Sequence, residues 1–328
     1  MSIGSRNVLV AGGAGFVGSH LVDTLLATGD SVTVIDNLLT GSIYNLESAL
    51  KNTNFEFIEA NINDHNVEAF ARKFDVVFHL ASPASPVDYL KNPLETLKSG
   101  SIGTLNLCEL AKKSNARLIL ASTSEVYGDP LVNPQPETYW GNVNPIGPRS
   151  VYDEAKRFSE AVVASYFREF GSNFGIVRIF NTYGPRMAFM DGRAVPNFTL
   201  QALQGLPLTI YGNGHQTRSL CYVEDLVAAL IRFSQVNHRG PVNLGNPHEI
   251  TMIELAKKII EVAGSNSILK YEAEVEDDPK VRCPDIEMAG KLIDWTPSWD
   301  LDQGLKATVT WYRERLKSLG TTNAGSKN

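Results

Sequence analysis

The sequence contains only three cysteines, Cys108, Cys221 and Cys283, which lie far apart and form no CxxC pair. This number and spacing exclude a disulfide framework and give no indication of a metal site. Unpaired thiols instead favour a reducing compartment. The longest run without a charged residue, 194–217, is interrupted by three glycines and two prolines, so it is not expected to span a membrane. No basic segment followed by an apolar one begins the chain, so no signal peptide is expected.

The chain also lacks an excess of positive charge, because 36 acidic against 30 basic residues give a net charge of −6. This balance provides no electrostatic basis for binding nucleic acid, so an anionic ligand has to be held by a few local basic side chains. With 43% apolar and 20% charged residues among 328, the composition is typical of a globular protein with one large domain or two ordinary ones. Together with the free cysteines, it predicts a cytoplasmic protein.

Two periodicities alternate through the first half of the sequence and predict an α/β fold. Apolar, β-branched runs predict strands at 7–11, 31–35, 55–59, 76–80, 117–121 and 176–180. Apolar residues that recur every three or four positions predict helices at 17–26, 94–113 and 151–170. This alternation is typical of a Rossmann-type, doubly wound parallel sheet. After residue 187 glycines and prolines punctuate shorter helices, at 224–234 and 252–262, so we predict a first domain at 1–186 and a smaller C-terminal lobe at 187–328, with some segments returning to the first domain.

A glycine-rich turn follows the first predicted strand and leads into an amphipathic helix. Glycines spaced as GxxGxxG leave room for a pyrophosphate at the helix N-terminus, where unpaired N–H groups and the helix dipole favour an anion. An acidic residue, Asp36, ends the second strand near the spacing at which a carboxylate binds an adenosine ribose and repels a 2′-phosphate. This pattern predicts NAD rather than NADP, with a first domain that binds the cofactor. The cofactor-binding residues expected here are Gly12, Gly15, Phe16, Val17, Gly18, Asp36 and Asn37.

Tyr152 and Lys156 form a YxxxK pattern that places both side chains on one face of a helix. A nearby ammonium and a cationic nicotinamide would stabilise the phenolate of Tyr152, which could then accept a hydroxyl proton. The alternative is an ordinary tyrosine and lysine on a half-exposed helix. The segment after the strand at 117–121 favours the catalytic interpretation, because parallel strands deliver ligand-binding residues at their carboxyl ends. That segment places Thr123 to share a substrate oxygen with Tyr152 and supplies the carboxylate of Glu125 for proton handling or water positioning.

These motifs resemble those of the extended short-chain dehydrogenase/reductase superfamily, and within it the UDP-glucuronate decarboxylase family, also called UDP-xylose synthases. The matching segments cover nearly the whole chain. They are ASPASP at 81–86, ASTSEVYGDP at 121–130, YWGNVNPIGP at 139–148, YDEAKR at 152–157, RIFNTYGPRM at 178–187, DGR at 191–193, QTRS at 216–219, 243–247 and DDPKVRCPDI at 277–286. The resemblance implies NAD as the cofactor and UDP-glucuronate as the substrate, with Tyr152 and Lys156 serving in catalysis and in NAD binding.

The residue after Thr123 separates two chemistries within this superfamily. Related 4,6-dehydratases carry an acid there, which protonates the departing 6-hydroxyl, whereas this chain has Ser124. A serine hydroxyl is too weak an acid for that task, but a substrate with a carboxylate at C6 does not need one. Oxidation at C4 would turn a glucuronate into a β-keto acid, which loses carbon dioxide readily. The implied cycle is oxidation at C4, decarboxylation, protonation at C5 and return of the hydride to C4, which yields UDP-xylose without net redox change.

The resemblance also implies the residues that bind the substrate. Arg218 is assigned to the diphosphate, Arg193 to the nucleotide portion and Arg282 to the reacting end, since planar guanidinium groups suit diphosphates and carboxylates. For each arginine the alternative is a surface salt bridge, which for Arg282 would involve the neighbouring acids at 276–278. Lys98 matches a glucuronate-binding lysine, the alternative being a solvated helix residue. Further expected contacts are Asn181 to a phosphate or sugar and Tyr211 to the ribose or base.

Two more expectations follow from the resemblance. Asn61, followed by Ile62, stands where these enzymes usually have an aspartate that binds the adenine amino group, and the Asn61 carbonyl could accept the same hydrogen bond. The helices at 94–113 and 151–170 resemble those that join two subunits through a four-helix bundle, so a homodimer is expected. In isolation, their apolar stripes would simply indicate packing onto the sheet of the same chain.

Two rival functions remain open from the sequence. The first is another enzyme on the same scaffold, a C4 epimerase or a 4,6-dehydratase that acts on a nucleotide sugar. The second is a cofactor-binding protein without catalytic activity. Because such proteins commonly lose the tyrosine or the lysine, the presence of Thr123, Tyr152 and Lys156 favours an enzyme.

Overall fold

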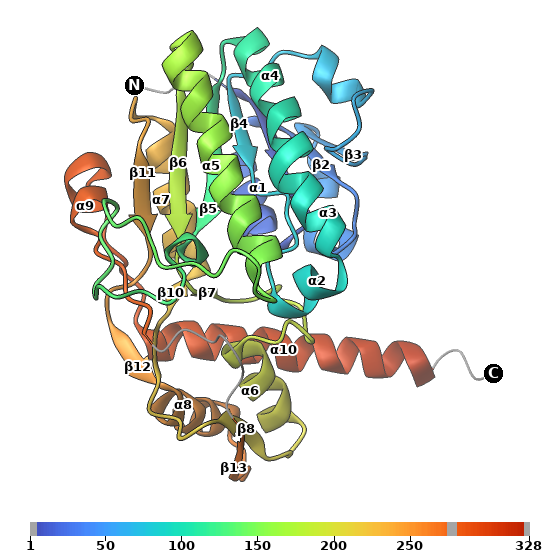
Figure 1. Ribbon diagram of the computed structural model, residues 1–328. Helices are drawn as coiled ribbons and strands as arrows, with labels where there is room; N and C mark the ends of the chain where they lie inside the picture. Colours follow the sequence, from blue (N-terminus) through green and yellow to red (C-terminus); the bar gives the residue numbers. More distant parts are fainter. Residues whose placement is uncertain (1–4, 274–280, 325–328) are drawn as a thin grey trace.

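A seven-stranded parallel sheet forms the centre of the protein (Figure 1). The computed structural model describes residues 5–273 and 281–324. The strand order is β11-β6-β5-β4-β1-β2-β3, which is the doubly wound arrangement expected from the sequence. The strands are β1 (Asn7–Ala11), β2 (Ser31–Asp36), β3 (Phe55–Glu59), β4 (Val76–His79), β5 (Arg117–Thr123), β6 (Phe174–Ile179) and β11 (Pro241–Leu244).

The predicted strands are all present, with differences at their ends. Strand β6 begins two residues before its predicted start, and β5 continues two residues past its predicted end because Ser122 pairs with Arg178 and Thr123 with Ile179 of β6. The seventh strand, β11, was not predicted. It is only four residues long, begins with a proline and lies far along the sequence, where residue pattern alone gave no reason to return it to the first sheet. Its partner is β6 at the outer edge.

Helices cover both faces of the sheet, and side chains alternate between the two cores as strand geometry requires. Along β1, Val8 and Val10 belong to one core cluster, with α1 and α7, while Leu9 and Ala11 belong to the other, with α4 and α5. In Figure 1, α4 and α5 lie in front of the sheet, with α1 and α7 behind it. The helices of this part are α1 (Phe16–Ala27), α2 (Pro86–Lys91), α3 (Pro93–Lys98), α4 (Thr104–Ser114), α5 (Ser150–Phe170), α7 (Val223–Ser234) and α9 (Glu287–Ile293).

The helix expected at 94–113 is interrupted by a π-helical turn at Ser99–Gly103, which joins α3 to α4. Two small contacts hold this turn against α5. The Ser159 hydroxyl donates to the Gly100 carbonyl at 2.7 Å, and a Cβ atom at Gly100 would come within 2.7 Å of the Ala155 Cβ. The turn therefore lets α5 pack closely, and α5 is the helix that carries the YxxxK pattern.

A smaller group of elements lies beyond the carboxyl ends of the central strands (Figure 1). It contains α6 (Ala194–Leu203), α8 (Met252–Ala263) and three two-stranded sheets. Their strands are β7 (Thr182–Tyr183) with β10 (Cys221–Tyr222), β8 (Leu208–Tyr211) with β13 (Leu269–Glu272), and β9 (Thr217–Ser219) with β12 (Glu249–Thr251). The long C-terminal helix α10 (Leu301–Ala324) passes between the sheet on one side and α6 and α8 on the other. Across the described parts of the chain, no helix combines the length and apolar character needed to cross a membrane.

One buried carboxylate fixes the segment between α9 and α10 to the back of the sheet. Asp225 of α7 accepts hydrogen bonds from the backbone N–H groups of Ser298 at 3.0 Å and Trp299 at 2.9 Å, and from the Ser298 hydroxyl at 2.8 Å. Its own carbonyl accepts from the Trp295 indole N–H at 3.0 Å. Since buried donors are costly to leave unpaired, this carboxylate orients the chain that enters α10.

We therefore expect Asp225→Ala to lower the free energy of unfolding by about 2 to 4 kcal/mol, because it leaves several buried donors without an acceptor. Thermal melting followed by circular dichroism measures the effect. The neighbouring exposed Glu224 provides the control, since Glu224→Ala removes the same charge without breaking these contacts. Equal melting temperatures for the two variants would contradict the anchoring role.

Candidate active site

A cavity of about 980 Å³ lies at the carboxyl ends of the central strands, between the sheet and the smaller group of elements. Fifteen residues predicted from the sequence line it: Gly12, Gly15, Phe16, Val17, Gly18, Thr123, Ser124, Glu125, Tyr152, Lys156, Asn181, Arg193, Tyr211, Arg218 and Arg282. Of the part of the chain that the structure describes, the wall does not include Asp36, Asn37, Asn61, Ile62 or Lys98. The cavity therefore joins the glycine turn, the YxxxK pair and the arginines in one site.

The glycine turn packs so tightly that side chains are excluded from it. Gly12 has a φ of +84°, and a Cβ atom on Gly18 would lie 2.2 Å from the Gly12 carbonyl oxygen. Helix α1 begins directly after Gly15, and no side chain caps it. Its first residues line the cavity, so their backbone N–H groups are available to a ligand there. This bare helix N-terminus, in a cradle that a Cβ would fill, fits the pyrophosphate of a dinucleotide.

The other predicted cofactor residues lie beside this cradle. Asp36 is buried and its carboxylate accepts hydrogen bonds from the backbone N–H groups of Ala14 at 3.0 Å and Leu38 at 2.9 Å. Burial raises its pKa, while these two hydrogen bonds lower it. The side-chain oxygen of Asn37 accepts a hydrogen bond from the Leu39 N–H at 3.1 Å. Asp36 thus braces the turn after Gly12 from the end of β2.

Three predicted binding residues lie together around Glu95 of α3 and the π-helical turn. The Asn61 amide donates to the Glu95 carboxylate at 3.5 Å, and Lys98 forms an ion pair with the same carboxylate at 2.9 Å. The Lys98 side chain is 50% exposed. Ile62 is buried, and its side chain packs at Gly103, where a Cβ atom would come within 2.4 Å of it. This cluster is a helix-surface contact outside the cavity wall.

Tyr152, Lys156 and Thr123 converge on one point of the cavity. Both side chains on α5 are buried, the Lys156 Nζ lies 5.8 Å from the centroid of the Tyr152 ring, and Tyr152 and Thr123 share a hydrogen bond. Lys156 also donates to the Ala121 carbonyl at 2.8 Å, which fixes its ammonium against the end of β5. The convergence matches the expected arrangement of a general base with its supporting groups.

The pKa values of Tyr152 and Lys156 without a bound cofactor do not favour the phenolate expected from the sequence. Burial, followed by the charge of Glu125, raises the pKa of Tyr152, although the Thr123 hydrogen bond and Arg193 lower it. Burial lowers the pKa of Lys156 to about 8, and Glu160 raises it in part. Desolvation dominates at both groups because both are buried, which helix periodicity alone does not reveal. Phenolate formation therefore requires further positive charge in the cavity.

A buried cluster of charges surrounds Glu125. Arg282, which is 5% exposed, binds both oxygens of the Glu125 carboxylate, with its Nη2 at 2.8 Å, and Arg149 donates to the same carboxylate at 2.9 Å. The two arginines hold the pKa of Glu125 at about 2 despite burial, which acts in the opposite direction. The alternative surface pairing of Arg282 involved residues 276–278, which lie outside the described residues, as do positions 277–280 of the DDPKVRCPDI motif. Ser124, between Thr123 and Glu125, is buried in the cavity wall.

Three residues of this region were not predicted. Tyr89 stacks on Tyr152, with ring centroids 5.1 Å apart and planes 7° apart, and its buried hydroxyl lines the cavity. Arg149 immediately precedes α5, one residue past the recognised YWGNVNPIGP segment, so its position beside that motif was the available signal. Asp153 is buried next to Tyr152, and burial, followed by the charge of Glu125, raises its pKa to about 7.

The remaining predicted substrate residues also line the cavity. Arg193 forms a two-point ion pair with Asp191, with an Nη2 to Oδ2 distance of 2.7 Å. An Arg218 nitrogen donates to the Thr217 carbonyl at 2.8 Å, and the ring of Tyr211 is 46% exposed. The Asn181 carbonyl accepts from the Cys221 N–H at 2.9 Å. These residues supply two guanidinium groups, an aromatic ring and an amide to the cavity wall.

Comparisons with known proteins agree with this geometry. Residues 8–245 match the model of the NAD dependent epimerase/dehydratase family. The chain is 52% identical over 319 residues to UDP-glucuronic acid decarboxylase 2 of Arabidopsis thaliana, covering 97% of this chain and 70% of the relative. It is 49% identical over 312 residues to UDP-glucuronic acid decarboxylase 1 of Xenopus tropicalis, covering 95% and 73%.

Solved structures show the same fold with different chemistry. UDP-glucose 4-epimerase of Thermotoga maritima, crystallised with UDP-glucose, superimposes with a TM-score of 0.87 at 32% identity, covering 94% of this chain and 99% of that one. A UDP-glucuronic acid 4-epimerase of Bacillus cereus, in complex with UDP-glucuronic acid and NAD, gives a TM-score of 0.84 at 27% identity, covering 94% and 99%. From the glycine cradle, the YxxxK pair and these matches, the chain belongs to the NAD dependent epimerase/dehydratase family, and within it to the UDP-glucuronic acid decarboxylases.

Proposed function

We propose that this enzyme converts UDP-glucuronate to UDP-xylose with NAD as a catalytic cofactor. The observation that carries the proposal is the Arg282–Glu125–Arg149 cluster beside Tyr152, in a wall where Ser124 replaces the acid that a dehydratase needs. The buried Arg282 and the partly buried Arg149 suit a sugar that carries a carboxylate at C6. The names of the relatives, which are decarboxylases over nearly the whole chain, support the same substrate.

The first step removes a proton from the sugar. Tyr152 accepts the proton of the C4 hydroxyl, while Thr123 donates to the same oxygen and Lys156 supplies positive charge 5.8 Å from the ring. When bound, NAD supplies reversible hydride transfer at C4 and a cationic ring that favours the phenolate. The glycine turn, Phe16 and Val17 would hold its pyrophosphate, and Asp36 at the end of β2 would accept hydrogen bonds from the adenosine ribose.

The second step breaks the bond between C5 and C6. With a ketone at C4, the C6 carboxylate belongs to a β-keto acid, so the electrons of the breaking bond move into the C4 carbonyl as carbon dioxide leaves. C5 is then protonated from water. Because the pKa of Glu125 is about 2, its carboxylate is ionised near neutral pH. Its role is therefore to orient this water and Arg282 rather than to donate a proton.

Arg193, Arg218, Tyr211 and Asn181 bind the nucleotide diphosphate at the other end of the cavity. Their support is position, since all four line the same cavity as Tyr152. The paired Asp191 holds the Arg193 fork in place, so less rotamer entropy is lost when it binds an anion. Lys98 would reach a substrate only by leaving its ion pair with Glu95.

A C4 epimerase is the second candidate, because structural neighbours of this chain include epimerases, one of them in complex with UDP-glucuronic acid. Both reactions share the C4 oxidation. They differ in whether the carboxylate leaves, so the number of carbons in the product separates them.

The enzyme acts as a homodimer through α3, α4 and α5. An exposed apolar stripe supports this assembly, because large side chains on these helices meet solvent in the single chain. It consists of Leu94, Leu97, Ile102, Leu105 and Phe158. A second copy of the same helices would cover it as a four-helix bundle. The three buried free cysteines support a reducing compartment, the cytoplasm.

Incubated with NAD and UDP-glucuronate, the purified protein should yield a nucleotide sugar lighter by one carbon dioxide. Mass spectrometry of the products measures this directly. Tyr152→Phe should retain NAD binding but turn over at least about 100-fold more slowly, because it lacks the general base. A product of unchanged mass and inverted C4 would identify an epimerase, and near-normal turnover of Tyr152→Phe would contradict the assigned base.

Arg282→Ala should lower turnover of UDP-glucuronate about 100-fold while NAD still binds. Arg282 is also the largest charge that lowers the pKa of Glu125, so this pKa should rise in the variant. Glu125 is then protonated at a higher pH, and the acid limb of the pH–rate profile should move upward. Arg239→Ala, which changes an exposed contact to the Gly171 carbonyl, provides the control. If the acid limb does not move, Arg282 does not control the pKa of Glu125 during turnover.

Leu97→Glu should dissociate the dimer, because it places a charge in the apolar stripe. Size-exclusion chromatography with light scattering measures the mass. Leu206→Glu, at a similarly exposed site between α6 and β8, should leave the mass unchanged. A monomeric wild-type protein, or a dimer that tolerates the change at Leu97, would contradict the proposed interface.

A further inference from the structure

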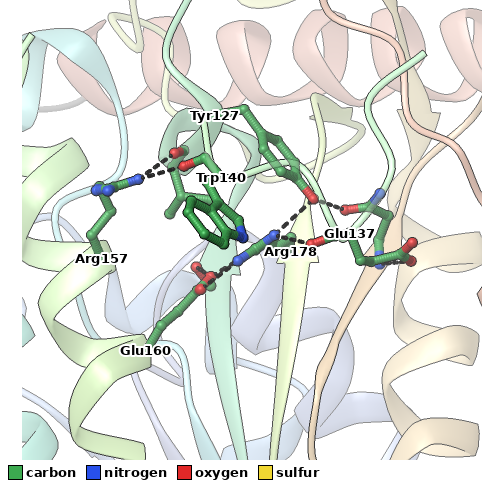
Figure 2. Close-up of polar contacts among 9 residues, drawn as sticks. Tyr127, Glu137, Trp140, Arg157, Glu160 and Arg178 are labelled. Carbon is green, nitrogen blue, oxygen red and sulfur yellow. Dashed lines mark hydrogen bonds and ion pairs between the residues drawn. The ribbon is translucent and has the colours of Figure 1, made fainter. Parts of the chain in front are cut away.

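A partly buried ion pair lies one helical turn beyond Lys156 (Figure 2). The Arg178 guanidinium of β6 binds both oxygens of the Glu160 carboxylate of α5, at 2.9 Å through Nε and 2.7 Å through Nη2. The two side chains are only 12% and 14% exposed. Removal of charges from water is costly, so a pair at this depth calls for a role beyond stability.

Arg178 is anchored independently of Glu160. Its Nη1 donates to the Tyr127 hydroxyl at 3.0 Å and to the Glu137 carbonyl at 3.0 Å, as Figure 2 shows. The Tyr127 hydroxyl in turn donates to Asn243 of β11 at 2.8 Å. The guanidinium is therefore fixed by the sheet and by the loop after β5, and it determines where the Glu160 carboxylate sits.

Glu160 connects this anchor to the catalytic end of β5. Its Oε1 accepts a 2.6 Å hydrogen bond from Ser122, which lies between Ala121 and Thr123. Ala121 supplies the carbonyl that binds the Lys156 ammonium at 2.8 Å. Three consecutive residues of β5 thus contact Lys156, Glu160 and Tyr152 in turn, and all three partners lie on α5 at spacings of one turn.

The groups that act on Lys156 come from α5 and β4. Tyr152 and Glu160 lie on its own helix, one turn to either side. His79 of β4 has its pKa lowered to about 3 by burial and by Lys156, so it is neutral near neutral pH. Glu160 is therefore the negative charge that offsets the desolvation of Lys156, with Arg178 of β6 behind it.

We propose that Glu160, held by Arg178, is a positioning residue that keeps Lys156 charged and aligned with the end of β5. This inference rests on the proposed function, because that function needs the ammonium of Lys156 beside Tyr152. Glu160 lies one turn away from the reacting atoms and acts only through Lys156 and Ser122.

Glu160→Gln tests the proposal, with Glu154→Gln as the matched control. Both glutamates lie on α5, but Glu154 is 38% exposed and pairs with Arg157 at 3.6 Å. Competitive acetylation of the purified full chain, resolved by peptide mass spectrometry, titrates Lys156 whether or not any sugar turns over. Glu160→Gln should lower the pKa of Lys156 by roughly one unit, and Glu154→Gln should leave it in place.

The pH–rate profile gives a second readout of the same effect. Lys156 loses its proton as the pH rises through its pKa, so a lower pKa brings the alkaline limb of kcat to a lower pH by roughly one unit. A purely structural role would lower kcat at every pH without moving this limb. The double variant Glu160→Gln with Arg178→Gln removes both charges, avoids a lone buried cation and should move the limb in the same direction.

Outcomes for the positioning role and for the proposed function are separate. If Lys156 titrates identically in wild type, Glu160→Gln and the double variant, the positioning role is wrong, whatever the enzyme does to UDP-glucuronate. If the pKa of Lys156 falls as expected but wild type releases no carbon dioxide, the positioning role holds and the proposed substrate is wrong. Should Glu160→Gln fail to fold by circular dichroism, the double variant decides.

Discussion

The pairing of the last two residues of β5 with β6 is the constraint on which the site depends. Ser122 and Thr123 remain in the sheet because Arg178 and Ile179 continue alongside them. This extension fixes the backbone from which the Ala121 carbonyl, the Ser122 hydroxyl and the Thr123 hydroxyl project. If β5 ended at Ala121, the contacts to Lys156, Glu160 and Tyr152 would depend on a loop, and rigid strands hold reacting groups more accurately than loops do.

Two carboxylates of this region follow one pattern, since each is paired with arginines held by other elements. Glu125, after β5, is bound by Arg149 before α5 and by Arg282 near the end of the chain. Glu160 of α5 is bound by Arg178 of β6. Because each pair joins distant parts of the sequence, the catalytic cluster forms only when the sheet, α5 and the C-terminal segments have all assembled. An acidic chain thereby creates a local site for an anionic sugar nucleotide.

Much of this arrangement could be predicted from local pattern. The glycine turn, the six predicted strands and the YxxxK helix all carry short-range signals, and the predicted residues Thr123, Tyr152 and Lys156 converge in the cavity. The unpredicted parts depend on contacts between distant segments. Strand β11 is too short to show a pattern, and Glu160 and Arg178 look like ordinary surface charges until α5 is placed on β6. The π-helical turn at 99–103 likewise has no periodic signature.

The absence of a Cβ atom at Gly18, next to the Gly12 carbonyl, has two structural consequences. The space without a Cβ atom allows α1 to reach the carbonyl of Gly12, and the same space opens the helix end toward the cavity. The close packing of α1 on the glycine turn and the space for a diphosphate therefore depend on the same missing side chain. A substitution at Gly18 would disturb both. A change in cofactor preference at the tip of β2 would also disturb this turn, because the Asp36 carboxylate accepts hydrogen bonds from the backbone N–H groups of Ala14 and Leu38.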